Sequence, residues 1–431
     1  MSELPTRRAM IAYALPALPL AALYFPVYVY IAPFYAGQRA VPLALMGTLF
    51  VVVRLLDAFS DPLMGWISDR TPERYGRRKL WLAVSVPLVA VSVWQLMVPP
   101  PDADFAHVAT WMTALTLSWT VALTPWYAWG AEMTGDYAGR ASVTAWREGT
   151  TLLGTVLAVI LYNIADGPSE GLRTIAVFVA FAMPITALAA LRFAPEPRNF
   201  SRTRLLPGAA VRALRDNVPF RRLIAAYFIN GSANALPAGL FLFFIEDYLG
   251  VPEAGWLLLV YFVCAIAGMP IWATLARHYP KHRVWGAAMI YACVVFAFVP
   301  FLRPGDVEAF LVICVLTGFA LSADLALPSA IQADVVDVDT ARHGEQRTGL
   351  FFALWSVATK AALAVAGGAA LIAIDASGFE AGGDNDPDAL RTLALLYAAV
   401  PVALKLLAVW MMWGFPIDRA EHDRLRLRIE A

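Results

Sequence analysis

Twelve apolar segments, each long enough to cross a bilayer as a helix, follow one another along this chain of 431 residues. A helix needs about 20 apolar residues to cross the hydrocarbon core of a bilayer. The sequence therefore predicts an all-α membrane protein with twelve transmembrane helices. We expect these helices over 9–36, 41–68, 80–99, 105–130, 145–164, 171–193, 221–248, 253–276, 284–302, 307–331, 348–374 and 389–415.

The composition excludes several other classes of protein. Hydrophobic residues make up 60% of the chain and charged residues only 15%, whereas a soluble domain carries about 25% charged residues. The net charge is zero, so nothing suggests a nucleic-acid partner. The sequence has no nucleophile elbow, metal-ligand cluster or glycine-rich phosphate loop, so we expect neither an enzyme nor a bound cofactor.

The basic residues predict the orientation of the helices. With both termini in the cytoplasm, 24 of the 33 Lys and Arg residues fall on the inside, four fall on the outside and five lie within or at the ends of helices. This bias is the positive-inside pattern of membrane proteins. Arg also outnumbers Lys by 29 to 4, which favours a bacterial source. We therefore expect a multi-pass protein of a bacterial inner membrane.

The longest basic loop divides the chain into two halves. We expect an N-terminal six-helix half over 1–193, a cytoplasmic linker over 194–220, a C-terminal six-helix half over 221–415 and a cytoplasmic tail over 416–431. This layout resembles the major facilitator superfamily, in which binding sites lie near the midplane between the two halves. We expect the protein to function as a monomer.

Three charged residues interrupt the second segment. Arg54, Asp57 and Asp61 are spaced by three and four residues, so they share one helical face. A charge inside a membrane costs several kcal/mol by insertion scales and usually marks a functional site. Two carboxylates one turn apart repel each other unless a cation, a proton or a basic group lies between them. The spacing predicts a cation site in a transport pathway, and the alternative is a purely structural ion-pair network.

Other polar residues also lie deep within apolar segments. Lys360 lies midway along segment eleven, where it either binds the solute and a segment-two carboxylate in turn or forms a fixed salt bridge between the halves. Asn230 and Asn234 share a helical face, and solute binding and hydrogen bonding between helices are equally compatible with them. Asp324 and Lys405 receive no assigned role.

The segment-two sequence resembles a known family. The pattern Arg-x-x-Asp-Ala-x-x-Asp-Pro-x-Met-Gly at 54–65 is similar to that of the glycoside–pentoside–hexuronide:cation symporters. Four further places agree in order and spacing: Pro125-Trp126-Tyr127, Arg147, the Ala-Asp-x-Val-Asp pattern at 333–337 and Lys360. The resemblance implies a symporter of the major facilitator superfamily that couples solute uptake to sodium or to protons.

The resemblance also implies roles for individual residues. The implied cation ligands, which would hold the metal if the cation is sodium, are Asp57, Asp61, Ser60 and Thr120. The implied solute-binding residues are Tyr28, Trp119, Trp126, Tyr127, Arg147, Trp355, Ser356 and Lys360. The implied gating residues are Arg54, Asp69 and Arg70.

The loop after segment two predicts a gate. Gly65 to Arg70, followed by Gly-Arg-Arg-Lys at 76–79, resembles the loop that the superfamily carries between its second and third helices. We expect Asp69 to accept hydrogen bonds from neighbouring helix N-termini and to hold the inward-closed state. The alternative is a solvated basic loop that only sets topology.

The chain departs from the family pattern in its first segment, which contains no acid. Where family members place aspartates on segments one and four, this chain has Ala21 and Leu123. A site without those acceptors should reject galactosides, because their hydroxyl groups lose hydrogen-bond partners. With Arg147 and Lys360 in the cavity, we expect an anionic or amphiphilic sugar derivative such as a uronide or a modified glycoside. The alternative is a cation-coupled lysophospholipid transporter.

Overall fold

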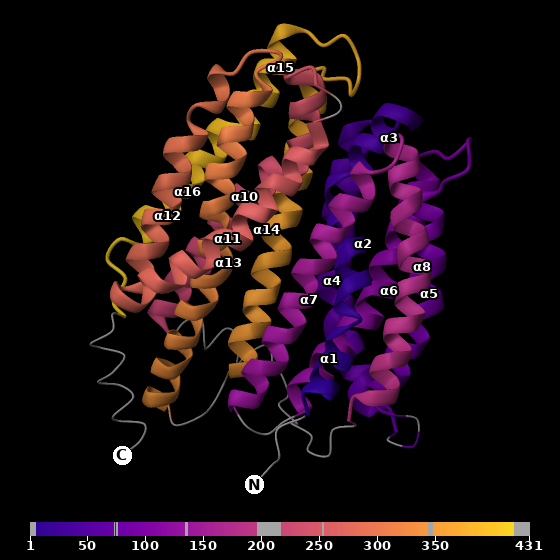
Figure 1. Cartoon of the computed structure of the whole chain (residues 1–431), viewed down its shortest axis with the longest axis vertical. Helices are drawn as coiled ribbons and strands as arrows, with labels where there is room; N and C mark the ends of the chain where they lie inside the picture. The colour runs from indigo at the N-terminus through magenta and orange to yellow at the C-terminus, as the bar shows by residue number, and fades with distance from the viewer. Residues whose placement is uncertain are drawn as a thin grey trace. The chain divides into compact units, whose positions relative to one another are not determined.

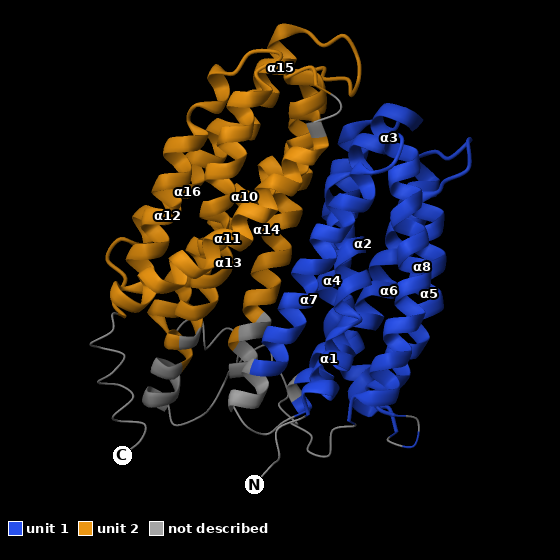
Figure 2. Cartoon of the chain, viewed as in Figure 1, with its two compact units in different colours: residues 1–202 blue, residues 203–431 orange. Residues whose placement is uncertain are grey.

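The computed structural model describes residues 6–72, 74, 76–133, 137–195, 217–251, 254–343 and 348–417 (Figure 1). The chain forms two compact units, unit 1 over Met1–Arg202 and unit 2 over Thr203–Ala431 (Figure 2). The predicted linker at 194–220 and the predicted tail at 416–431 fall mostly outside the described residues. The boundaries of the two predicted halves therefore stay predictions.

Unit 1 is built from helices that run side by side along its length (Figure 1). Its helices are α1 (Arg7–Ala14), α2 (Ala17–Val29), α3 (Ile31–Arg39), α4 (Leu43–Arg70), α5 (Lys79–Met97), α6 (Phe105–Glu132), α7 (Tyr137–Asn163) and α8 (Pro168–Phe193). The first predicted segment consists of three of these helices in succession. Proline explains both breaks, because Pro16 precedes α2 and Pro33 lacks the N–H that would continue the helix across Tyr30.

The secondary-structure elements of unit 2 are also helices, among the residues that the structure describes. Its helices are α10 (Val218–Phe243), η2 (Phe244–Tyr248), η3 (Ala254–Trp256), α11 (Leu257–His278), α12 (Lys281–Phe296), η4 (Val299–Phe301), α13 (Val307–His343), α14 (Thr348–Ala376), α15 (Pro387–Ala394), η5 (Leu395–Ala399) and α16 (Val400–Met412). Short π- and 3₁₀-helical pieces join several of them, so η2 continues α10 and η5 joins α15 to α16. All twelve predicted segments are therefore occupied by helices, and the predicted all-α fold is confirmed.

Side-chain caps and close-packed glycines position the helices. The Asp104 side chain accepts a hydrogen bond from the His107 backbone N–H at 3.0 Å, and Asn217 caps α10 in the same way through Phe220 at 2.9 Å. A Cβ at Gly154 in α7 would collide with the backbone carbonyl of Leu18 in α2. Glycine therefore allows α2 and α7 to approach closely, as small residues do between membrane helices.

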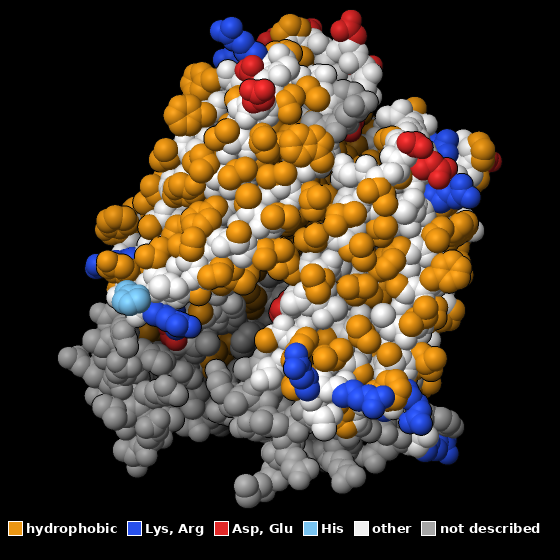
Figure 3. Space-filling view, in the orientation of Figure 1, with side chains coloured by type: hydrophobic (Ala, Val, Ile, Leu, Met, Phe, Trp, Pro, Cys, Tyr) orange, Lys and Arg blue, Asp and Glu red, His pale blue; other side chains and the backbone are white. Residues whose placement is uncertain are grey.

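The surface of the described residues suits a bilayer. Ten helical stretches are long and apolar enough to cross a membrane, and α6 and α7, which cover the remaining two predicted segments, have 28 and 27 residues. Figure 3 shows hydrophobic side chains over the middle of the visible face of each unit and charged side chains near the ends. Large apolar side chains such as Phe59, Phe181 and Trp410 are more than two-thirds exposed, as expected for groups that face lipid.

Candidate functional site

A cluster of oxygen atoms lies between α4 and α6 in unit 1. The Thr120 hydroxyl oxygen lies 3.1 Å from Asp61 Oδ1, 3.2 Å from Ser60 Oγ and 3.4 Å from Asp57 Oδ1. Thr124, one turn further along α6, donates to Asp61 Oδ1 at 3.4 Å. The structure thus brings together all four predicted cation ligands, and it adds Thr124, which the sequence analysis missed. Carboxylate and hydroxyl oxygens are donors that hard cations and protons share.

Arg54 belongs to the same cluster. Its guanidinium donates to Asp57 Oδ2 at 3.0 Å, and the Asp57 side chain is 3% exposed. The predicted gating role of Arg54 stays a prediction, and its contact in this structure is with a predicted cation ligand. The guanidinium also lies 5.3 Å from the ring centroid of Tyr24, which in turn packs against Trp119. Tyr24 was not among the predicted residues, although its position one turn before Tyr28 places both on one face of α2.

The predicted aromatic residues of unit 1 differ in exposure. Tyr127 is 44% exposed, whereas Trp126 and Tyr28 are buried. The Trp126 indole N–H donates to the Tyr13 carbonyl at 3.0 Å, and the Tyr13 hydroxyl donates to the Trp126 carbonyl at 3.1 Å. Tyr28 packs against Phe50. In this structure Trp126 and Tyr28 are therefore packing residues, and Tyr127 presents its ring at the surface of unit 1.

Arg147 lies over the ring of Tyr127. Its guanidinium carbon is 4.2 Å from the ring centroid, which is a cation–π distance. The same guanidinium forms an ion pair with Glu148 at 2.7 Å, and the Glu148 side chain is 58% exposed. The positive charge that the sequence analysis assigned to solute binding is thus partly neutralised by its own neighbour.

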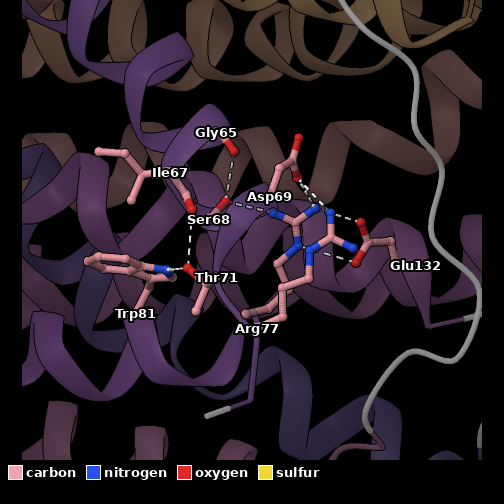
Figure 4. Close-up of polar contacts among 9 residues, drawn as sticks. Gly65, Ile67, Ser68, Asp69, Thr71, Arg77, Trp81 and Glu132 are labelled. Atoms are coloured by element: carbon pink, nitrogen blue, oxygen red, sulfur yellow. Dashed lines mark hydrogen bonds and ion pairs between the residues drawn. The ribbon is translucent and has the colours of Figure 1, made fainter. Parts of the chain in front are cut away.

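A network of hydrogen bonds and ion pairs, which we call the latch, joins Ser68, Asp69, Arg77, Arg78 and Glu132 (Figure 4). Asp69 at the end of α4 accepts hydrogen bonds from Arg77 at 3.0 Å and from Arg78 at 2.7 Å. Arg78 also binds the Ser68 hydroxyl at 2.6 Å and both carboxylate oxygens of Glu132 at 2.6 and 3.2 Å. The expectation that helix N-termini would supply the hydrogen bonds to Asp69 was wrong about the donors, because guanidinium groups from the following loop supply them.

The electrostatic interactions of the latch favour the charged form of Arg78. Burial alone would lower the pKa of Arg78, but its hydrogen bonds and charge interactions with Glu132 and Asp69 outweigh burial and raise the pKa above its ordinary value. Arg70, which was also a predicted gating residue, lies 3.9 Å over the ring of Trp66 instead of joining the latch. The sequence analysis missed Glu132. An acid at the end of segment four, opposite a basic loop, is a pattern that predicts an ion pair.

Unit 2 carries an ion pair at a matching place. Lys281, the first residue of α12, binds both oxygens of Asp334 in α13 at 2.7 and 2.8 Å. Asp334 belongs to the Ala-Asp-x-Val-Asp pattern, of which the Asp337 side chain lies outside the described part. This ion pair therefore joins the start of α12 to α13.

The remaining predicted residues of unit 2 lie along α14. Trp355 stacks on the ring of Tyr227 at 3.7 Å, and the Tyr227 hydroxyl lies 2.9 Å from the hydroxyl of Thr359. Ser356 is exposed and Lys360 is half-buried. The roles of Trp355, Ser356 and Lys360 stay predictions.

A second polar cluster lies inside unit 2, and its ion pair was not predicted. Asp324 in α13 pairs with Lys405 in α16 at 2.7 Å. Asn230 and Asn234 both hydrogen-bond to this pair, which supports hydrogen bonding between helices, and solute binding by these amides stays a prediction. In this structure the two amides connect helices within unit 2. Among the described residues no group of three or more His, Cys, Asp or Glu side chains is placed to hold a metal ion.

Comparison with known proteins places these sites in context. The model of the family described as "MFS/sugar transport protein" matches residues 12–419. The putative glycoside/cation symporter YagG of Escherichia coli (strain K12) is 24% identical, over 87% of this chain and 84% of that protein. The sodium-dependent lysophosphatidylcholine symporter 1 of Gallus gallus is 23% identical, over 90% of this chain and 81% of that protein.

Solved structures support the fold. The crystal structure of a D-xylose–proton symporter superposes with a TM-score of 0.66 at 13% sequence identity, covering 95% of this chain and 97% of that one. At this identity the likeness shows the fold alone, which is that of the major facilitator superfamily.

Proposed function

The chain belongs to the MFS/sugar transport family of the major facilitator superfamily, and on that premise we propose that it imports a sugar-like solute together with a cation. The solute and the cation move by alternating access, in which two six-helix halves rock about a site near the membrane midplane. The relative named as a glycoside/cation symporter supports this proposal.

The oxygen cluster of unit 1 carries the proposal. Thr120 Oγ1 lies within 3.1–3.4 Å of three other oxygens, two of them from carboxylates. Within the group formed by Asp57, Asp61 and Arg54, the charges are two negative and one positive, so one monovalent cation makes the group neutral. Neutralisation lowers the cost of burying the group and removes the repulsion between the carboxylates. Both sodium and a proton fit this chemistry.

The solute-binding residues of unit 1 follow from exposure and charge. The Tyr127 ring offers an exposed face, and Arg147 offers a guanidinium held above it. A carboxylate or sulfonate on the solute would replace Glu148, which is largely exposed and adjacent in sequence. A bidentate bond between guanidinium and oxyanion gives geometric specificity as well as energy. This supports an anionic sugar derivative as the solute.

The latch around Asp69 and Arg78 serves as the gate. We place it on the cytoplasmic side, together with both termini, because 24 basic residues fall on that side and four on the other. Cation and solute binding would favour the state in which this latch opens, since a ligand shifts a conformational equilibrium by its difference in affinity between the two states.

Solute-induced cation flux in proteoliposomes tests the proposal. Neutral sugars, uronides, sulfonated sugars and lysolipids are added in turn, with sodium and pH varied separately. We expect a flux with one sugar class, and we expect Asp57→Cys to abolish accumulation while the protein still inserts. Asp166→Asn, at an exposed loop acid of the same unit, is the matched control. Cation-driven accumulation by Asp57→Cys would refute the assignment of the cation site.

A second candidate function is transport of a lysophospholipid. The sodium-dependent lysophosphatidylcholine symporter that matches 90% of this chain favours it. The acid-free helices α1 to α3 would suit an acyl chain better than a row of hydroxyl groups. A flux with lysophosphatidylcholine and with no sugar would select this candidate, and the reverse result would eliminate it.

A further inference from the structure

Five polar side chains meet inside unit 2. They come from four helices: Asn230 and Asn234 from α10, Trp285 from α12, Asp324 from α13 and Lys405 from α16. The Lys405 ammonium nitrogen lies 2.7 Å from Asp324 Oδ2 and 2.8 Å from Asn230 Oδ1. We call these five residues the lysine cage.

The lysine cage is buried at membrane depth. The Asp324 side chain is 8% exposed and that of Lys405 is 11% exposed. Asp324 lies near the middle of the candidate span Val307–Val336. A buried ion pair gives little net stability, because desolvation of both charges offsets their attraction. Stability alone is therefore a weak reason for two charges at this depth, where ionisable groups usually mark sites.

The carboxylate of Asp324 is oriented by groups other than Lys405. Its Oδ1 accepts a hydrogen bond from the Trp285 indole N–H at 2.7 Å. Its Oδ2 accepts one from the Asn234 amide at 3.1 Å. Both donors are neutral and both lie on helices other than α16. The carboxylate is thus held in place independently of its ammonium partner, as a preformed ligand would be.

The ammonium of Lys405 occupies the position that a small cation would take. Its two contacts are with oxygen atoms, one from a carboxylate and one from an amide, and both distances suit charge-assisted bonds. We propose that the lysine cage is a monovalent-cation site whose resident cation is the chain's own tethered ammonium. Removal of that ammonium converts the cage into a site for a small external cation such as methylammonium.

This inference goes beyond the proposed function, because it concerns a second cation position in a different unit. A tethered ammonium cannot be exchanged with the solvent. The lysine cage therefore keeps its own cation, and a coupling cation from solution would bind at the oxygen cluster of unit 1 instead.

Chemical rescue of a lysine-free variant tests the lysine cage. The full-length Lys405→Ala protein is purified in detergent, and its melting temperature is measured in methylammonium chloride and in choline chloride at equal ionic strength. In choline we expect a loss of several degrees relative to the wild type, because Asp324 is left buried without a cation. In methylammonium we expect recovery of most of that loss, whereas the wild type should melt alike in both salts. The melting temperature does not depend on transport, so failure here is distinguishable from failure of the proposed function.

Two further variants separate cation binding from general salt effects. Lys405→Met fills the space with an apolar chain and should show no rescue. Asp324→Asn combined with Lys405→Ala removes the negative ligand and should also lose the rescue. Equal melting of Lys405→Ala in both salts, or a rescue that persists in the double variant, would overturn the proposal. If Lys405→Ala fails to fold, expression with methylammonium in the medium should restore monodisperse protein, and no recovery would also overturn it.

Discussion

Replacement of Thr120 by valine tests the oxygen cluster of unit 1 most directly. Valine keeps the branched shape of threonine and removes only the hydroxyl group, so α6 should keep its packing. The hydroxyl lies 3.1 Å from Asp61 Oδ1, 3.2 Å from Ser60 Oγ and 3.4 Å from Asp57 Oδ1. We expect the affinity for the coupling cation to fall.

The distances give the size of the effect. A hydroxyl has one proton, so Thr120 donates to only one carboxylate at a time and keeps its lone pairs for a bound cation. The 3.1 Å contact with Asp61 is the shorter of the two carboxylate contacts. Loss of one interaction with a charged group costs about 1.5–3 kcal/mol. Since about 1.4 kcal/mol corresponds to a tenfold change, cation affinity should fall about 10- to 100-fold.

The matched control is Thr124→Val on the same helix. Its hydroxyl contacts only Asp61 among the cluster residues, at 3.4 Å, which is long for a hydrogen bond between oxygens. We therefore expect this variant to lose less than about threefold in cation affinity. The assay is the melting temperature of the purified protein as sodium replaces choline at fixed pH, with a parallel pH series for protons. A midpoint in Thr120→Val equal to that of the wild type would refute the assignment of Thr120.

Three other changes probe the latch, the predicted solute contact and the helix packing. Glu132→Gln leaves the buried Arg78 with one fewer carboxylate and should cost about 1.5–3 kcal/mol of latch stability. The measurement is faster alkylation of a cysteine introduced beside the latch, because the chain's three cysteines all lie in unit 2. Glu148→Gln removes the neighbour that neutralises Arg147 and should raise the affinity for an anionic solute, measured by direct binding. Gly154→Val forces α2 and α7 apart and should lower the melting temperature by several degrees, measured by thermal denaturation.

Two of these changes have a matched control. Glu170→Gln breaks an exposed ion pair with Arg173 and should leave alkylation unchanged. Gly149→Ala adds a Cβ that meets no atom within 4 Å, so its melting temperature should stay near that of the wild type. Unchanged alkylation in Glu132→Gln, unchanged solute affinity in Glu148→Gln or wild-type melting in Gly154→Val would each contradict its prediction.

Local spacing made the segment-two charges predictable. Arg54, Asp57 and Asp61 share a helical face because the α-helix repeats every 3.6 residues, and the hydrogen bond between Arg54 and Asp57 follows from that repeat. Thr120 is different, because it lies 59 residues from Asp61 and no local pattern links them. Only the family resemblance supplied Thr120, so this part of the cluster depended on knowledge outside the physics of the chain.

Long-range pairs between helices were beyond local reasoning. Arg78 and Glu132 are 54 residues apart, and Asp324 and Lys405 are 81 residues apart. Apolar segments predict that helices exist, but not which faces of them meet, because many packings bury similar apolar area. The ion pair between Asp324 and Lys405 therefore could not be predicted from the sequence, because it depends on how the helices of unit 2 pack.

An ion pair like that of the latch recurs in unit 2, although the surrounding sequences of the two units differ. Arg78 precedes α5 and binds Glu132 at the end of α6, over a separation of 54 residues. Lys281 begins α12 and binds Asp334 in α13, over a separation of 53 residues. In both units the pair joins the start of the third predicted segment to the fourth. Because the two six-helix units have the same internal layout, these residues occupy equivalent positions. One basic and one acidic side chain are therefore enough to form the same ion pair in each unit.

The cation cluster, in contrast, has no counterpart among the described residues of unit 2. Helix α11 corresponds to α4 as the second predicted segment of its half, and it contains no Asp or Glu at all. The buried carboxylate of Asp324 lies instead on α13, where the ammonium of Lys405 pairs with it. An internal repeat thus explains the latches but not the ion sites. If an equivalent site in unit 2 could carry the coupling cation independently, Asp57→Cys would lose only part of its cation dependence, whereas a single exchangeable site predicts complete loss.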